Sequence, residues 1–300
     1  QFSSQGNTME RLLISLLAIW GLQNVVAACF ADWPQYRGEM QRTAYVAQDL
    51  EGTNWQPAWS LATQTAASPT WPKPARGSLW QSLEHIEARV NHDRGDHPLI
   101  AADQDGKLHV LLALGGGDRL LSIDPVTGRV EWQCYADAPI RYAPCTGDGK
   151  LWFGSDDGKV RALDIATGKV LWEYHIGPDW KWIIGNGRLI SPHPIRTSLM
   201  LVGDRIMATA GLFPSQGVYA VALEKDSGKL LWRTRLQQSP QGYSLSAGDE
   251  RLILPTGRSQ PFMLDVETGE TLAQLPSPGG SFCMVTEQGF FAGPGNSPRL

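Results

Sequence analysis

The stretch Gly177–Pro194 is the best candidate for a binding site in this sequence. It brings aromatic rings, cations, an acid, an amide and a histidine together, and an arginine follows directly. This mixture offers stacking surfaces, charge and hydrogen bonds in one loop, which suits ligand or partner binding. An alternative stays open, in which the loop is structural and its tryptophans cap the core of a neighbouring repeat. We predict a binding loop made by Asp179, Trp180, Lys181, Trp182, Asn186, Arg188, His193 and Arg196.

Other groupings carry less specific chemistry. His92–His97 holds two histidines and two aspartates, but no second ligand group lies at a supporting spacing, so we interpret it as a polar loop and predict no metal site. Gly115–Gly117 lacks the Lys-Ser/Thr pair of a phosphate-binding loop and is interpreted as a hairpin turn. The cysteines are too widely spaced for a disulfide framework. Three are therefore expected to be isolated core residues: Cys134, Cys145 and Cys283.

Composition and charge narrow the class of protein. The 300 residues are 42% hydrophobic and 19% charged, which is typical of a globular chain. The formal net charge is −4, so no basic surplus exists to neutralise phosphates, and we predict no nucleic-acid partner. Twelve tryptophans are many for this length and indicate a packing role that is repeated along the chain.

The N-terminal residues 1–31 are interpreted as upstream sequence followed by a secretory signal. A short charged start at Met9–Arg11 precedes the apolar run Leu12–Leu22, which is too short for a confident membrane span. Cleavage after Ala31 would give a periplasmic or secreted protein. Cleavage after Ala28 would leave Cys29 as a lipidation site, and thus an envelope lipoprotein attached to the membrane only through that lipid. Both alternatives place the folded part outside the cytoplasm.

A fourfold repeat must position the binding loop. An Asp-x-x-Thr-Gly turn between two apolar strands, with Trp four residues after the glycine, recurs with its glycines 40, 60 and 41 residues apart. A period near 40 made of strands is typical of a β-propeller, and the longer interval carries an insertion. The repeat is defined by Asp124, Gly128, Trp132, Asp164, Gly168, Trp172, Glu224, Gly228, Trp232, Asp265 and Gly269.

Each part of the repeat has a physical role. The glycine supplies the left-handed backbone position that the turn needs, and the Asp and Thr side chains can bond backbone groups across it. A tryptophan at a fixed offset can seal one blade against the next. The third repeat has the mild changes Glu224 and Ser227, and the fourth has Ala273 in place of Trp, which predicts a looser contact there.

The sequence therefore predicts an all-β propeller of four-stranded blades. A fifth blade is expected to begin at Ser281, and in the second blade the first two strands are expected at Ile140–Cys145 and Leu151–Ser155. The full blades are predicted near residues 98–135, 139–176, 195–236 and 243–276.

An N-terminal extension, residues 32–97, is expected to precede the blades of residues 98–300. Within it, Asn54–Leu61 is interpreted as a strand that closes the propeller ring, and the spacing of apolar residues in Ser78–Val90 predicts a short surface helix.

These segments resemble the pyrroloquinoline-quinone (PQQ) enzyme repeat. Asp32–Gly38 is also similar to the Asp-Trp-Pro-x-x-Arg opening of exported PQQ-like propellers of planctomycete-type bacteria. The family includes quinoprotein alcohol dehydrogenases and the non-catalytic outer-membrane assembly propeller. The resemblance spans residues 32–300 and implies seven or eight blades in a full protein. About four and a half are present here, so we expect that the chain is truncated at its C-terminus.

The repeat is specific for the fold and says little about function, because catalytic and non-catalytic members share it. We predict an exported, monomeric, non-catalytic scaffold without a cofactor that binds a protein, a glycan or another envelope ligand. One alternative is a PQQ- and calcium-dependent alcohol dehydrogenase, although the adjacent cysteine pair of such enzymes is absent and their calcium ligands map onto no motif. Another is that the propeller is one module of a longer multidomain protein.

Overall fold

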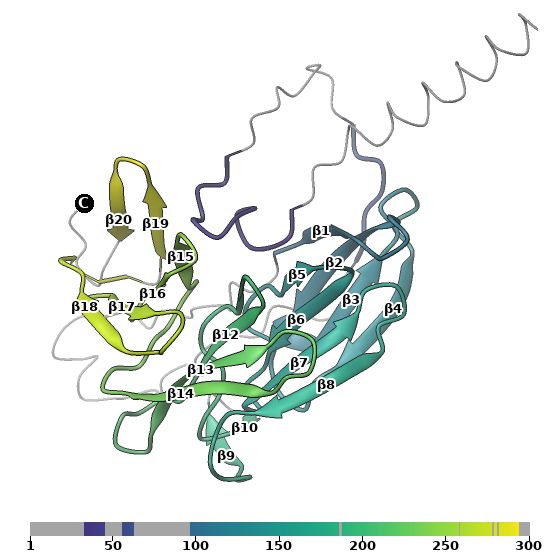
Figure 1. Cartoon of the computed structure of the whole chain (residues 1–300). Helices are drawn as coiled ribbons and strands as arrows, with labels where there is room; N and C mark the ends of the chain where they lie inside the picture. The colour runs from purple at the N-terminus through teal and green to yellow at the C-terminus, as the bar shows by residue number, and fades with distance from the viewer. Residues whose placement is uncertain are drawn as a thin grey trace, which may run out of the picture. The chain divides into compact units, whose positions relative to one another are not determined.

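The chain divides into two units, residues 1–32 and 33–300, and everything described here belongs to the second. Its computed structural model is made of β-strands (Figure 1). Four antiparallel sheets of four strands succeed one another, and a two-stranded hairpin follows the fourth. The prediction of an all-β propeller of four-stranded blades is confirmed. The structure describes residues 33–45, 56–62, 97–185, 188–257, 259–277, 279–280 and 282–293.

In each sheet the strands are paired in chain order. The first sheet contains β1 (Leu99–Ala102), β2 (Leu108–Leu114), β3 (Arg119–Ile123) and β4 (Val130–Tyr135). The second contains β5 (Cys145–Gly147), β6 (Lys150–Gly154), β7 (Lys159–Asp164) and β8 (Val170–His175). The third contains β11 (Met200–Val202), β12 (Arg205–Ala210), β13 (Val218–Glu224) and β14 (Leu230–Leu236). The fourth contains β15 (Leu245–Ala247), β16 (Arg251–Leu254), β17 (Phe262–Asp265) and β18 (Thr271–Gln274).

Among the described residues, two hairpins lie outside these four sheets. One consists of β19 (Phe282–Thr286) and β20 (Gly289–Gly293), where a fifth blade is predicted to begin. The other consists of β9 (Ile183–Gly185) and β10 (Arg188–Ile190), which form a separate two-stranded sheet within the insertion between the second and third blades. The predicted binding loop therefore contains a short β-hairpin.

Each described Thr-Gly turn in the first two blades is built in the same way. In the second blade, the Asp164 carboxylate accepts hydrogen bonds from the Thr167 amide at 2.8 Å and from the Thr167 hydroxyl at 2.6 Å. Gly168 has a φ of +69°, a conformation that costs a glycine little. In the third blade, Ser227 donates to Glu224, so the substituted pair makes the corresponding side-chain contact.

The repeat tryptophans join neighbouring blades. The Trp132 indole donates to the Ile165 carbonyl of the next blade at 2.8 Å. Its ring lies so close to Gly168 that a Cβ there would be 2.6 Å away. Trp172 and Trp232 cover the next turn glycine in the same way, and each donates to a carbonyl of that turn. We call Trp59, Trp132, Trp172 and Trp232 the tryptophan ladder.

Trp59 extends the ladder to the first blade. Its indole donates to the Pro125 carbonyl at 2.8 Å, and its ring covers Gly128, the glycine of the first turn. Residues 56–62 form no regular strand, which differs from the strand expected at Asn54–Leu61. The closing of the ring by this segment stays a prediction. The helix expected at Ser78–Val90 lies outside the described residues.

The predicted first strand of the second blade is wrong in its position. Residues 140–144 form no strand, and β5 begins at Cys145. Pro144 has no amide to donate to a neighbouring strand, which explains why pairing starts only after it. Ile140 is nevertheless fully buried, so its apolar character reflects core packing rather than a strand.

One smaller prediction about the fold is confirmed, and a second, on the cysteines, is confirmed for two of its three residues. Gly115–Gly117 forms a short 3-10 turn between the antiparallel strands β2 and β3, which is a hairpin connection. Cys134, Cys145 and Cys283 are free thiols, and the last two are buried. Burial raises the pKa of Cys145 and of Cys283 to about 12, so both stay protonated and unreactive at neutral pH.

Candidate binding surface

The β9–β10 hairpin lies at the lower edge of Figure 1. It presents apolar side chains to solvent. Ile184 and Leu189 are directly opposed across the two strands, and they are 83% and 61% exposed. The next pair faces the other way, because Ile190, opposite Ile183, is buried. Side chains alternate along a strand, so Trp182 extends the outward face, and it is 51% exposed.

Trp180 is held in place without being buried. Its ring stacks on the His175 imidazole, with the ring centroids 3.9 Å apart and the planes inclined by 19°. Burial lowers the pKa of His175, so a neutral imidazole supports the indole at neutral pH. The Lys159 ammonium lies 5.5 Å from the indole centroid, and Trp180 stays 72% exposed. We call Trp180, Trp182, Ile184 and Leu189 the hairpin surface.

The charged groups of the loop are paired. Asp179 and Lys181 form an exposed ion pair at 2.9 Å, and this hydrogen bond lowers the pKa of Asp179. Arg188 pairs with Asp118, which precedes β3. Burial raises the pKa of Asp118 even though the Arg188 cation opposes the shift. Because these charges are already satisfied, exposed apolar area rather than net charge distinguishes the loop.

His193 lies inside the protein. Its Nε2 is 3.2 Å from the Gln216 carbonyl, and its side chain packs against Gly177, where a Cβ would lie 2.7 Å from Nδ1. The ring therefore closes the base of the loop, where it is not exposed to a partner.

Arg196 belongs to a buried ionic cluster. Its Nε lies 3.3 Å from Asp156 Oδ1, while Arg141 Nε lies 2.5 Å from Asp156 Oδ2. Asp156, on the turn between β6 and β7, is fully buried. Two guanidinium groups from successive blades thus hold one carboxylate. Beside them, burial raises the pKa of Tyr142 to about 12, and its ring contacts Tyr243 edge-on.

The eight predicted binding residues do not form one surface. Asp179, Trp180, Lys181, Trp182 and Arg188 lie on the outer side of the loop, whereas His193 and Arg196 are buried. Asn186 lies outside the described residues. Sequence reasoning missed Arg141 and Asp156. A signal for the arginines exists, because Pro-Ile-Arg occurs twice, at 139–141 and at 194–196, in each case with three residues between the arginine and the first strand of a blade.

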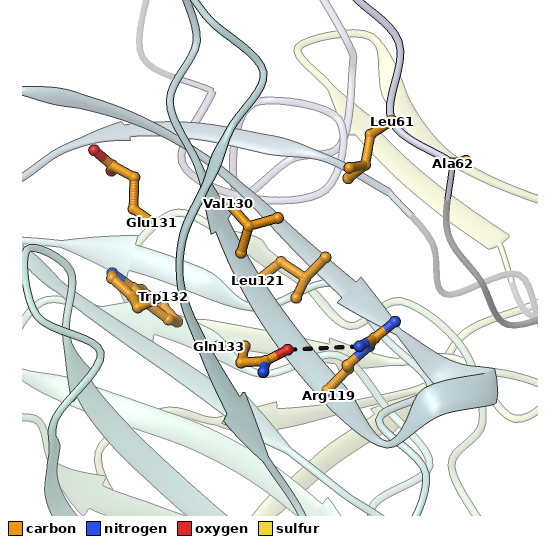
Figure 2. A pocket seen from close by; sticks show the side chains of 8 residues that line it. All are labelled: Leu61, Ala62, Arg119, Leu121, Val130, Glu131, Trp132 and Gln133. Atoms are coloured by element: carbon orange, nitrogen blue, oxygen red, sulfur yellow. Dashed lines mark hydrogen bonds between the residues drawn. The ribbon is translucent and has the colours of Figure 1, made fainter.

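A separate cavity of about 410 Å³ lies over the first blade (Figure 2). Leu121 and Val130 are among its apolar lining residues, and Arg119 donates a long hydrogen bond of 3.5 Å to Gln133 at its side. Glu131 is engaged by Lys107 and by His109, whose Nδ1 is 2.8 Å away. The cavity thus offers apolar surface with one engaged acid and no nucleophile among its lining residues.

A calcium-bound quinone would need a group of metal-ligating side chains. Within the part of the chain that the structure describes, no three His, Cys, Asp or Glu side chains are grouped as metal ligands would be. Asp156 is bridged by two arginines, an arrangement suited to holding a carboxylate rather than a cation. The described residues therefore do not fit a calcium-bound quinone. No helix among the same residues is long and apolar enough to cross a membrane.

Known proteins resemble parts of this chain. A family model described as outer membrane protein assembly factor BamB matches residues 73–183. The quinoprotein alcohol dehydrogenase PedH of Pseudomonas putida is 30% identical over 106 residues, which are 35% of this chain and 16% of that protein. The dehydrogenase subunit of the quinone alcohol dehydrogenase of Gluconobacter oxydans is 23% identical over 184 residues, 57% of this chain and 23% of that protein.

The structural likeness extends further along the chain. The quinohemoprotein alcohol dehydrogenase of Comamonas testosteroni superposes with a TM-score of 0.55 at 14% identity, covering 83% of this chain and 42% of that chain. At this identity the likeness concerns the fold alone. The matches span only 16% and 23% of the two curated relatives, whose activities therefore do not transfer with them. This chain is a β-propeller whose sequence is similar both to the BamB family model, over residues 73–183, and to quinoprotein alcohol dehydrogenases.

Proposed function

We propose that this propeller is a non-catalytic module that binds a protein of the cell envelope through the hairpin surface. The observation that carries the proposal is the exposure of four large apolar side chains on one loop that lies outside the blade sheets. Contiguous exposed apolar side chains rimmed by polar groups are characteristic of protein interaction sites. Asp179, Lys181 and Arg188 supply such a polar rim.

A protein fits this surface better than a glycan does. Ile184 and Leu189 offer only aliphatic area, which gives no hydrogen bond to sugar hydroxyl groups. The same aliphatic pair, with two tryptophans beside it, resembles the apolar centre of a protein interface, where aromatic residues are enriched. The similarity to a model described by outer membrane protein assembly also favours a protein partner.

A location outside the cytoplasm is part of the proposal. It rests on the charged and apolar pattern of residues 9–31, which is typical of a secretory signal, and on the outer-membrane description of the family model.

Site-specific cross-linking in cells tests the docking surface. A photoreactive residue replaces Ile184 in the full chain, and a matched one replaces Leu171, a 44% exposed side chain on β8 outside the hairpin surface. We expect one protein, identified by mass spectrometry, to cross-link at position 184 and not at position 171. With that protein purified, Ile184→Asp should weaken the Kd by about tenfold or more, whereas Leu171→Asp should not change it.

Three outcomes would contradict the proposal. Equal cross-linking at both positions would show that the hairpin is not special. Adducts that contain a glycan or a lipid and no peptide would point to a different class of ligand. An unchanged Kd for Ile184→Asp would place the interface elsewhere on the protein.

A quinoprotein alcohol dehydrogenase is the second candidate, because both curated relatives described above carry that activity in their names. It predicts that the full chain, mixed with PQQ and calcium, acquires quinone absorbance and reduces an electron-accepting dye with an alcohol. Absence of PQQ binding under these conditions would remove this candidate, whereas calcium-dependent dye reduction would overturn the non-catalytic assignment.

A further inference from the structure

Residues 33–44, drawn in purple in Figure 1, are hydrogen-bonded to the first strands of several sheets, and we call them the inner strap. Trp33 pairs with Ile100 in β1, exchanging hydrogen bonds of 2.8 and 3.2 Å. The Pro34 carbonyl accepts from the Thr146 amide in β5 at 2.9 Å. Further along, the Met40 carbonyl accepts from Ser246 in β15, and the Gln41 carbonyl accepts from Val285 in β19. One short segment is thus bonded to the first strands of four different sheets.

Two side chains anchor the inner strap. The Tyr36 ring stacks on Tyr243, with the centroids 3.6 Å apart and the planes inclined by 18°. Arg42 is fully buried, and its guanidinium donates to the Ser244 carbonyl at 3.0 Å and to the Tyr36 carbonyl at 2.7 Å. The guanidinium also donates to the hydroxyl of Ser198 at 3.4 Å. Ser198 precedes β11 of the third blade.

The bound strap also carries unfavourable features. Arg37, Arg42 and Ala44 have φ values of +60°, +63° and +57°, a left-handed conformation that residues with a Cβ rarely adopt and that costs free energy. The Arg42 cation is buried against oxygen atoms of carbonyl and hydroxyl groups, and burial lowers its pKa to about 10. Both costs are released when the segment leaves its place and Arg42 returns to water.

The backbone hydrogen bonds that hold the strap are few in each sheet. Each of these four sheets contributes only one or two backbone hydrogen bonds to the strap, whereas strands within a blade share complete antiparallel ladders, such as the six registered pairs of β12 and β13. The strap is otherwise held by the Thr146 hydroxyl, which donates to Pro34, and by Trp33, Tyr36 and Met40, which pack against the core. Detaching only part of the strap would release little free energy, because Tyr36, Arg42 and the backbone hydrogen bonds lie on one continuous short segment. Opening of the whole segment, with the blades intact, should therefore require less free energy than unfolding a blade.

We infer that residues 33–44 are a detachable strap that closes the inner side of the propeller and opens as one cooperative unit, uncovering Tyr243 and the inner strands. This device is separate from the hairpin surface and does not depend on the proposed function. Its opening would expose the inner ends of the blades to a ligand, while its closure keeps them covered by the chain's own residues.

Native-state hydrogen exchange on the unmodified full chain tests the inference. The amides of Thr146, Ser246 and Val285 donate to the strap, whereas that of Val221, in β13, lies within a blade ladder. We expect the three strap-bonded amides to share one opening equilibrium, and to exchange about a hundredfold faster than Val221 after correction for intrinsic rates. Three different openings, or exchange only through global unfolding, would overturn the inference.

A pair of glycine variants sharpens the test. Gly38 in the strap and Gly106 between β1 and β2 both have a φ of +82°. A Cβ at Gly38 would lie 3.1 Å from the Trp33 ring, while a Cβ at Gly106 meets nothing within 4 Å. Gly38→Ala should speed exchange at Thr146, Ser246 and Val285 by one common factor of about tenfold. Gly106→Ala should leave these amides unchanged.

Unequal factors at the three amides in Gly38→Ala would show that the strap does not move as a unit. An equal response to Gly106→Ala would show that the effect is general destabilisation. If Gly38→Ala fails to fold, the exchange pattern of the unmodified chain still decides between one common opening and several.

Discussion

The tryptophans of the ladder and those of the hairpin surface share a residue type but differ in what their rings meet. The Trp132 ring packs on Gly168, and its indole donates to the Ile165 carbonyl. Both groups lie at a fixed place in the next blade. Trp182 lies in the insertion, outside the register of the repeat, and half of it faces solvent. In this chain, register within the repeat rather than residue type separates packing tryptophans from those available for binding.

The largest change in the free energy of unfolding is expected for a substitution in the tryptophan ladder. Trp172→Ala removes a ring packed on Gly228 and a 3.0 Å hydrogen bond to the Lys225 carbonyl. We expect a loss of about 3 kcal/mol in the free energy of unfolding, measured with urea. Trp172→Phe keeps a ring and loses the hydrogen bond, so it should lose less. A Trp172→Ala protein as stable as the parent would show that the blades do not depend on this contact.

The next effect concerns the glycine beneath a ladder ring. Gly168 and Gly248 have the same φ of +69°, but a Cβ at Gly168 would meet the Trp132 ring, and a Cβ at Gly248 meets nothing within 4 Å. Gly168→Ala should therefore be about 1–2 kcal/mol more destabilising than Gly248→Ala. Equal melting temperatures for the two variants would mean that backbone strain alone, and not the tryptophan contact, requires glycine there.

A smaller effect concerns the turn carboxylates. The Thr127 amide and hydroxyl hold the pKa of Asp124 below its usual range. A lowered folded-state pKa stabilises the protein above the unfolded pKa of about 3.9, and this contribution is lost as pH falls through the folded value. Asp124→Asn should lower the melting temperature at about pH 6 and less so at about pH 3. A difference that does not vary with pH would contradict the role of the charge.

The smallest effect on stability is expected at the hairpin surface. Trp182→Ala removes a ring that is 51% exposed, so the free energy of unfolding should change by no more than about 0.5 kcal/mol. Urea unfolding of Trp182→Ala beside Trp172→Ala measures the contrast directly. A large loss for Trp182→Ala would mean that the ring contributes to the core, as the structural interpretation of the loop holds.

Short-range sequence patterns were sufficient for the blades and their turns. Gly128, Gly168, Gly228 and Gly269 mark hairpins whose residues are near neighbours in the chain, so spacing alone predicts them. The position of β5 was predicted wrongly, because Ile140 is apolar for core packing and Pro144 delays pairing. Apolar character alone does not distinguish a buried connection from a strand.

The binding loop was predicted as one surface, and the structure divides it. Trp180 and Trp182 face solvent, while His193 and Arg196 are buried beneath. Nothing within the loop itself encodes this division, because Arg196 turns inward to Asp156, which lies on a turn of the preceding blade. The partner of each side chain, and hence its exposure, comes from another repeat.

Local patterns in the chain thus specified an all-β propeller, its period and its turn residues, since each depends on neighbours a few positions away. The folded arrangement alone decided that Arg141 and Arg196 share Asp156, and that residues 33–44 cross the inner strands. Arg42 illustrates the reason, because its partner Ser244 is 202 residues away. Contacts over such separations arise only when the blades come together, and no local periodicity records them.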